Sequence, residues 1–349
     1  MSDDRDPYRL PPQAGGSTPL PWATPATSQP WPTSPAPPVE GRTGRPVVHP
    51  EPQPYHRLLI ARGYAWWRPL LGLVVLGAAF VALTVLVTII IVVIDAARTG
   101  DSFDQAFERF GTEVDPLFLL GTNLSLAVAI PAAVLAIVLA HRLRPGWLSS
   151  VVGRLRWGLL LRLSLLAFVV VVGFTLLGGF LPADDDMVVD MGDVELVSLS
   201  RWLTFAIVIL LTTPLQSAAE EYAFRGYAFQ ALGAWFRTPW IGAIATSLAF
   251  AFAHGTQNLP LFLDRFAFGL IACWLVVRTG GLEAAIALHA MNNIVIFLLT
   301  AAVDDIGDTL VISEIPWPAV VIDVAQMLVF AWLADRHVRK RGHARISVR

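Results

Sequence analysis

Two long apolar runs constrain this chain more than any other feature of its sequence. Residues 69–94 and 116–140 extend over 26 and 25 residues without a single Asp, Glu, Lys or Arg. A helix needs about 20 apolar residues to cross the hydrocarbon core of a bilayer, where its backbone must satisfy its own hydrogen bonds. Both runs are therefore predicted to be transmembrane helices.

The composition agrees with a membrane protein. The 349 residues are 55% hydrophobic and 15% charged, against about 25% charged residues in an average soluble protein. The net charge of -2 offers no basic face, so we expect no nucleic-acid partner. The single cysteine, Cys273, excludes an intrachain disulfide and a cysteine-based metal cluster.

Six further apolar segments follow, separated by charged loops or by loops that contain Gly and Pro. The eight predicted transmembrane helices cover approximately residues 69–94, 116–140, 163–182, 202–219, 238–254, 261–277, 282–302 and 317–334. We thus predict an all-α, polytopic membrane helix bundle with a tail at each end. The first 55 residues hold 15 of the 25 prolines, which predicts a disordered, proline-rich tail over residues 1–60 whose P-x-x-P spacings could bind a cytoplasmic partner.

Loop charge alternates along the chain and predicts the orientation. Arginines precede the first span, follow the second and fill the basic tail at 336–349, whereas the loops at 95–115, 184–195 and 304–314 are acidic. Because Lys and Arg are retained on the cytoplasmic side, both termini are predicted to be cytoplasmic, as the even number of spans requires. The Arg-rich composition with almost no Lys is typical of a GC-rich bacterial genome, which favours the bacterial inner (plasma) membrane.

Ionisable groups inside a span are costly, so they are candidates for function. Glu220, Glu221 and Arg225 lie where the fourth predicted span ends. On a helix Glu221 and Arg225 are four residues apart and are expected to form an ion pair, while Glu220 projects about 100° away and stays free. The alternative is that both carboxylates are solvated at a helix end.

Two later spans carry histidines. Phe250 precedes His254 by one helical turn, and His289 and Asn293 are four apart, on one face of the seventh span. The alternatives are an interfacial histidine at 254 and interhelical hydrogen bonds at 289 and 293. Together, a free glutamate, two histidines and an asparagine on three helices suit water activation and oxyanion binding, which implies amide hydrolysis.

The motifs E-E-x-x-x-R, F-x-x-x-H and H-x-x-x-N, in this order and each in its own span, resemble the CPBP family of intramembrane peptidases. That family includes the type II CAAX prenyl endopeptidases and bacteriocin-processing relatives, and the resemblance covers about residues 145–300 of the chain. It implies that Glu220 and His254 activate water and that His289 and Asn293 form the oxyanion hole. It also gives Glu221, Arg225 and Phe250 supporting roles. The chain is then divided into the tail at 1–60, two helices at 61–140, a peptidase core at 141–335 and the basic tail.

Metal dependence stays open at this level. Glu220, His254 and His289 could equally be two-histidine, one-carboxylate ligands of zinc with an open position for water. Because no H-E-x-x-H motif is present, we favour the metal-free mechanism, which needs no cofactor. The predicted topology also places His254 near the outer end of its span and His289 in the inner half of its own, so the fifth span must start later or tilt.

The sequence thus predicts a membrane-embedded endopeptidase that cleaves a membrane-associated or secreted peptide, with the peptide substrate and the lipid bilayer as partners. The alternatives are a non-catalytic immunity or peptide-binding scaffold protein of the same fold, and a transporter. Four more polar residues need explanation. Asp264 and Arg265 are expected at the outer interface, or else line the cavity, and Asp323 with Gln326 lies deeper in the last span.

Overall fold

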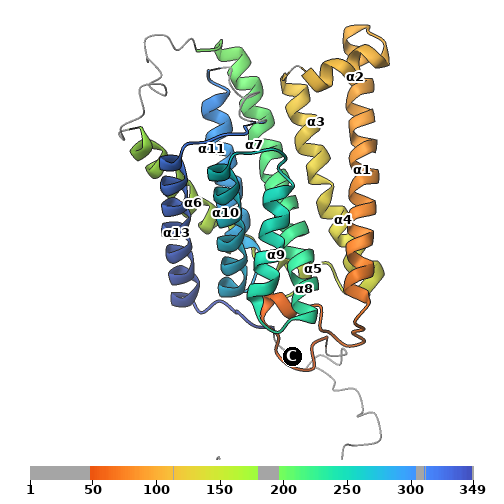
Figure 1. The fold of residues 1–349 in the computed structure, drawn as a ribbon, viewed down its shortest axis with the longest axis vertical. Helices are drawn as coiled ribbons and strands as arrows, with labels where there is room; N and C mark the ends of the chain where they lie inside the picture. Colours follow the sequence, from red (N-terminus) through yellow and green to blue (C-terminus); the bar gives the residue numbers. More distant parts are fainter. Residues whose placement is uncertain (1–47, 113, 180–195, 304–309, 311, 348–349) are drawn as a thin grey trace, which may run out of the picture. The chain divides into compact units, whose positions relative to one another are not determined.

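The fold is a bundle of helices (Figure 1), seen in a computed structural model that describes residues 48–112, 114–179, 196–303, 310 and 312–347. Within these ranges no β-strand forms beyond two isolated bridges. The elements are η1 (Tyr55–Arg57), α1 (Arg68–Thr99), α2 (Phe103–Thr112), α3 (Pro116–Ala127), α4 (Ala129–Ala136), η2 (Ile137–His141), α5 (Gly146–Ser149), α6 (Trp157–Gly178), α7 (Leu199–Glu221), η4 (Tyr222–Ala228), α8 (Phe229–Trp235), α9 (Pro239–Phe252), α10 (Leu259–Thr279), α11 (Glu283–Thr300) and α13 (Trp317–Lys340). The predicted all-α class is confirmed.

Seven helices in the described part of the chain are long and apolar enough to cross a membrane. They are Arg68–Thr99, Pro116–His141, Trp157–Gly178, Leu199–Trp235, Leu259–Thr279, Glu283–Thr300 and Trp317–Lys340. Each corresponds to one predicted span. The third helix begins at Trp157, earlier than predicted. Arg162, which the prediction placed before the span, lies inside this helix and is exposed. A long arginine side chain near a helix end can reach the interface, so its charge does not end the span.

The fifth predicted span, 238–254, is not a full crossing. It is α9, a helix of 14 residues that begins at Pro239 and ends at Phe252. At about 1.5 Å per residue it extends about 21 Å, short of the hydrocarbon core of about 30 Å. The helix stops there because Gly255 adopts a left-handed conformation with a φ of 79°, and Asn258 then caps α10 through its side chain.

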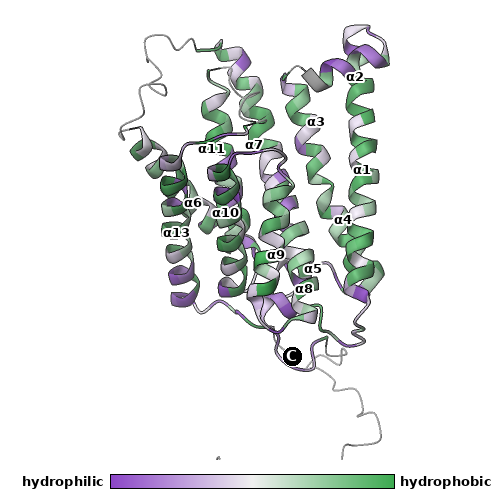
Figure 2. Cartoon of the chain, in the orientation of Figure 1, coloured by the Kyte–Doolittle hydropathy of each residue, from purple (hydrophilic) through white to green (hydrophobic). Residues whose placement is uncertain are grey.

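Helix α11 lies at the centre of the bundle. It packs against α6 and α7, while α9 packs on α10, α10 on α13, and α3 on both α7 and α1. In the apolar window of α11, 56% of the residues are buried, against 11% in α1. Figure 2 shows mostly hydrophobic residues along α1, many of which are exposed, as expected for a helix that faces lipid on most sides.

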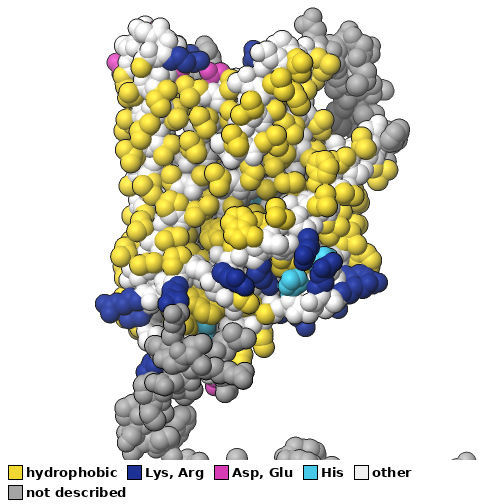
Figure 3. Space-filling model, turned by 180° about the vertical axis from the view of Figure 1, so that it is seen from behind, with side chains coloured by type: hydrophobic (Ala, Val, Ile, Leu, Met, Phe, Trp, Pro, Cys, Tyr) yellow, Lys and Arg dark blue, Asp and Glu magenta, His cyan; other side chains and the backbone are white. Residues whose placement is uncertain are grey.

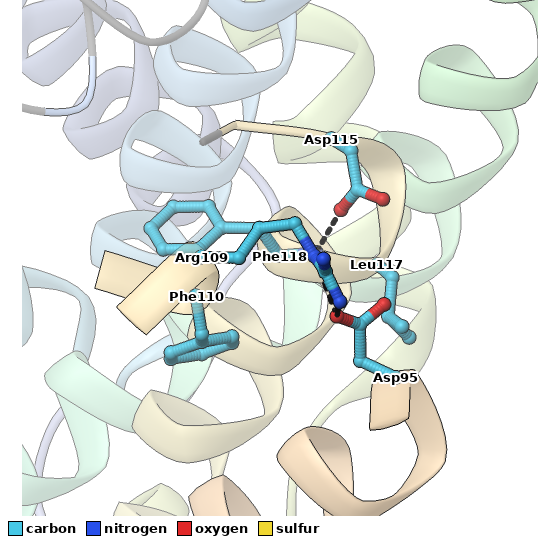
Figure 4. A pocket seen from close by; sticks show the side chains of 6 residues that line it. All are labelled: Asp95, Arg109, Phe110, Asp115, Leu117 and Phe118. Atoms are coloured by element: carbon cyan, nitrogen blue, oxygen red, sulfur yellow. Dashed lines mark hydrogen bonds and ion pairs between the residues drawn. The ribbon is translucent and has the colours of Figure 1, made fainter. Parts of the chain in front are cut away.

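Charged side chains gather at the two ends of the helices. Figure 3 shows a broad hydrophobic band, with most Lys and Arg along one edge and Asp and Glu at the opposite end. At the acidic end the predicted loop 95–115 contains helix α2, which Arg109 ties to α1 and its neighbouring loop through Asp95 (2.6 Å) and Asp101 (2.7 Å). The cavity in this corner (Figure 4) is only about 20 Å³, which is room for about one water.

The predicted tail at 1–60 is too long. Residues 48–60 are folded: Tyr55, Leu58 and Leu59 are buried, and the Tyr55 hydroxyl donates to the Leu148 carbonyl at 2.5 Å. The apolar sequence after the last prolines supplies side chains that cover one end of the bundle, which a purely polar tail could not do. Residues 1–47 lie outside the described residues.

The basic tail at 336–349 is likewise shorter than predicted. Helix α13 continues to Lys340, and Ser347 exchanges two hydrogen bonds with Gln53, each of 2.8 Å. The segments near the two ends of the described chain are therefore paired with each other. This pairing closes the Arg-rich end of the bundle.

A glycine on α8 tests whether the segment around Tyr55 belongs to the fold. A Cβ at Gly233 would collide with the backbone carbonyl of His56, which cannot move like a flexible side chain. We expect Gly233→Val to destabilise the protein by about 1–3 kcal/mol through overpacking, measured as a lower midpoint of heat unfolding in detergent. Gly77→Val is the matched control because nothing lies within 4 Å of its Cβ position. Equal midpoints for the two variants would contradict the packing described.

Candidate functional site

The candidate site starts where helix α7 changes its hydrogen-bonding pattern. The chain stays helical from Leu199 to Trp235, but residues 222–228 form the π-helical segment η4. Glu220 and Glu221 are the last two residues of α7 before this change. Isolated π-helical turns within helices are rare and often occur at functional sites, because they turn side chains away from their regular positions.

Glu221 and Arg225 form the predicted ion pair. Arg225 Nη1 donates to Glu221 Oε1 at 3.0 Å, and both side chains are fully buried. The guanidinium carbon lies 4.4 Å from the ring centre of Phe250 and 5.2 Å from that of Phe268, on α9 and α10. Aromatic faces attract such a cation, so the rings stabilise the buried pair. The alternative of two solvated carboxylates is wrong for Glu221.

His289 of α11 is held by the same carboxylate. Its Nδ1 lies 2.9 Å from Glu221 Oε1 and must carry the proton, because an ionised carboxylate only accepts hydrogen bonds. The imidazole stands edge-on to Phe268, with ring centres 4.9 Å apart. This orientation directs the other ring nitrogen, Nε2, toward Glu220 Oε2 at 3.7 Å.

Glu220 is partly held and partly open. The side-chain amide of Gln216 donates to its Oε1, whereas Oε2 is buried and has no hydrogen-bond partner among the described residues. The 3.7 Å between Oε2 and His289 Nε2 is too long for a direct hydrogen bond. A water or a substrate atom could bridge the two atoms, since each would then be within reach. Glu220 was predicted to have no partner, and this is true of Oε2 but not of Oε1.

Asn293 lies beside the glutamates, on the same face of α11 as His289. Its amide nitrogen donates to Gln216 Oε1 at 3.3 Å and to Ser217 Oγ at 3.4 Å. Sequence reasoning did not identify Gln216 and Ser217, although each lies four residues before one of the glutamates and so shares its helix face. These long contacts are the interhelical hydrogen bonds of the alternative interpretation, and they are weak enough to be exchanged for a ligand.

His254 approaches the site from the end of α9. Its Nδ1 lies 2.7 Å from the Phe250 carbonyl and therefore donates to it, and its ring is exposed. The ring centre of Phe250 lies 4.6 Å from that of His254 and 6.0 Å from that of His289, so Phe250 connects His254 to the site. The later start that the sequence allowed for the fifth span is not seen: α9 begins at Pro239, and it ends at Phe252, two residues before His254.

Two of the four remaining polar residues of the spans form hydrogen bonds. Arg265 Nη1 donates to Gln257 Oε1 at 2.7 Å, so Arg265 lies at the expected place beside the turn before α10. Gln326 of α13 donates to Asn292 of α11 at 3.1 Å. Asp264 Oδ1 is buried and has no hydrogen-bond partner among the described residues.

The predicted zinc ligands do not fit a metal ion in this arrangement. Among the described residues, no group of three His, Cys, Asp or Glu side chains could hold one. Nδ1 of His289 and Nδ1 of His254 both donate to protein oxygens, which leaves Nε2 of each ring open. Metal dependence therefore stays a prediction.

Comparisons with known proteins match the same part of the chain. Residues 201–295, which include every candidate site residue, match the family model described as "Type II CAAX prenyl endopeptidase Rce1-like". An uncharacterized 24.3 kDa protein of Escherichia coli is 36% identical over 127 residues, which are 35% of this chain and 55% of that protein. The uncharacterized protein YyaK of Bacillus subtilis (strain 168) is 26% identical over 110 residues, 30% of this chain and 37% of YyaK.

These matches have a limited extent. The chain spans 55% and 37% of the length of the two curated relatives that it matches, and neither relative has an assigned activity. No solved structure matches the chain. The family match and the seven apolar helices support a multi-pass membrane protein of the CAAX-protease type.

The buried ion pair allows a test of the site's architecture. Arg225→Met would leave the Glu221 carboxylate buried with His289 as its remaining hydrogen-bond partner, so we expect a loss of about 3–5 kcal/mol in stability. The measurement is the heat-unfolding midpoint in detergent, with Arg237→Met, an exposed arginine near the end of the same long helix, as control. Adding Glu221→Gln to Arg225→Met should recover part of the loss. A stable Arg225→Met protein would contradict the enclosed pair.

Proposed function

We propose that this chain is an intramembrane peptidase, because residues 201–295 match the family model of the Rce1-like type II CAAX prenyl endopeptidases. Its substrate would be a membrane-associated or secreted peptide, cleaved at a peptide bond. The observation that carries the proposal is the pair of open atoms, Glu220 Oε2 and His289 Nε2, which face each other at 3.7 Å inside the bundle. The same proposal places this chain in the bacterial inner membrane as a multi-pass protein with both termini in the cytoplasm.

Glu220 would act as the general base. A water bound at Oε2 gives its proton to the carboxylate as its oxygen attacks the peptide carbonyl carbon. His254 supports this step with its Nε2, which carries no proton while Nδ1 donates to the Phe250 carbonyl, and which can therefore accept from the same water. Gln216 keeps the carboxylate in place through Oε1.

His289 and Asn293 would stabilise the tetrahedral intermediate. The Asn293 amide leaves its long contacts with Gln216 and Ser217 and donates to the oxyanion. His289 donates from Nε2 when its ring carries both protons, since Nδ1 remains on Glu221. The C–N bond then breaks, and the proton held by Glu220 passes to the leaving amine, so that the products are a carboxylic acid and an amine.

Replacement of Glu220 tests the proposed base. Gln has nearly the same shape but cannot accept the proton, so we expect Glu220→Gln to lower kcat by about 100- to 10,000-fold. The measurement is cleavage of a mixed peptide library by the purified protein in detergent, read by mass spectrometry. Glu314→Gln, at an exposed glutamate outside the candidate site, should keep full activity.

The same assay distinguishes a metal-free from a metal-dependent mechanism, and an enzyme from a peptide-binding scaffold. Activity that survives a chelator supports the metal-free mechanism, whereas activity lost in chelator and restored by zinc contradicts it. If the folded wild type cleaves nothing but retains a peptide, the scaffold alternative replaces the enzyme.

Asn293 can be compared with its neighbour in the chain. Asn293→Ala removes a donor that acts in the transition state, so we expect kcat to fall about 100- to 1,000-fold with little change in KM. Asn292→Ala is the matched control because Asn292 faces α13, where it accepts from Gln326. Similar losses in both variants would show that Asn293 contributes to helix packing rather than to the reaction.

A further inference from the structure

A second cavity lies at the Arg-rich end of the bundle, away from the candidate site. Its volume is about 570 Å³, and it is formed by the loop before α6, the first turns of α6 and residues 342–344. The polar part of its lining consists of Arg154, Arg156, Arg162 and His343. Among the described residues no carboxylate lines it, so this lining is basic.

The three arginines of this lining differ in whether a carboxylate pairs with them. Arg156 is fully engaged: it binds the Glu283 carboxylate at 2.7 and 2.9 Å and the carbonyls of Thr279 and Ala344. Arg154 and Arg162 are exposed, and the described part of the chain provides neither with a carboxylate at ion-pair distance. Two guanidinium groups at the mouth of the cavity therefore lack a counter-charge.

His343 shows the same surplus of positive charge. Burial lowers the pKa of His343, and Arg156, His337 and Arg162 lower it further, against a smaller opposite effect of Glu283. Its Nε2 is buried and has no hydrogen-bond partner among the described residues. A neutral imidazole with an unused nitrogen can accept from a hydroxyl group of a ligand.

The start of α6 adds backbone donors. No side chain caps this helix of 22 residues, so the amides of its first turn, at Trp157 and Gly158, have no acceptor within the helix. Gly158 is exposed, and nothing lies within 4 Å of its Cβ position. An anionic oxygen therefore has room to approach these amides, at the positive end of the helix dipole.

An exposed apolar row leads from the cavity along α6. Trp157, Leu161, Leu165 and Val169 follow one another at intervals of four residues and are 66%, 67%, 66% and 61% exposed. Figure 3 shows Lys, Arg and His side chains directly beside the hydrophobic band. A ligand with an anionic head and an apolar chain matches both parts, whereas free phosphate matches only the first.

We propose that this cavity binds the phosphodiester headgroup of an anionic phospholipid, with an acyl chain along the exposed row of α6. The phosphate oxygens accept from Arg154, Arg162 and the first amides of α6. Basic pockets beside transmembrane helices on the cytoplasmic side bind anionic lipid headgroups by such contacts. The site is independent of the proposed peptidase activity.

Native mass spectrometry of the full chain in detergent, titrated with phosphatidylglycerol or phosphatidylcholine, tests this site. We expect phosphatidylglycerol to bind more tightly, and Arg154→Gln with Arg162→Gln to weaken it about 30-fold. Arg62→Gln with Arg144→Gln is the matched control, because it removes two exposed arginines outside the cavity. An equal loss in the control pair would overturn the proposal in favour of general surface charge.

Gly158→Leu provides a variant that keeps every charge. It adds a bulky side chain to the cavity lining, where nothing lies within 4 Å of the Gly158 Cβ position, so we expect it to weaken phosphatidylglycerol binding at an unchanged unfolding midpoint. Full binding in this variant, or equal affinity for phosphatidylcholine, would overturn the site. Displacement of the lipid by millimolar inorganic phosphate without an apolar chain would instead identify a free-phosphate site and overturn the lipid assignment.

Discussion

The Glu221 carboxylate is the contact on which the arrangement of the candidate site depends. It accepts from Arg225 on the following turn of its own helix and from His289 on α11, under the rings of Phe250 and Phe268. Removing two charges from water is costly, so such a pair persists only when its geometry and further hydrogen bonds compensate. The contact with His289 fixes both the tautomer and the direction of the imidazole. Glu220 Oε2 and His289 Nε2 meet only because of that direction.

Much of this arrangement could be predicted from the sequence. The apolar runs identify the long helices because hydrocarbon leaves the backbone no other solution, and four-residue spacing identifies the Glu221–Arg225 pair and the common face of His289 and Asn293. The spacing rule also holds for Gln216 and Ser217, but these residues are neutral and common on helices. Their contacts with Asn293 depend on the position of α11, which the sequence does not give.

Other features were beyond sequence reasoning. The depth of His254 depends on where α9 ends, and no charge in that apolar segment marks the end. The folding of residues 48–60 depends on a surface they cover, Leu148 and α8, which is distant in the chain. Arg162 lies inside a helix whose start the charge rule placed after it. In each case the cause is a tertiary contact or a boundary position, which a local pattern does not contain.

Helix α11 is held at two points along its length. Its first residue, Glu283, is bound by Arg156, and His289 is bound by Glu221, six residues or about 9 Å later. Two such anchors fix both the rotation and the depth of a helix, which explains why α11 can be the most buried of the spanning helices. Asn293 follows one turn after the second anchor. Its position therefore does not require strong hydrogen bonds of its own, and its contacts of 3.3 and 3.4 Å can be exchanged for a ligand without loss of the helix geometry.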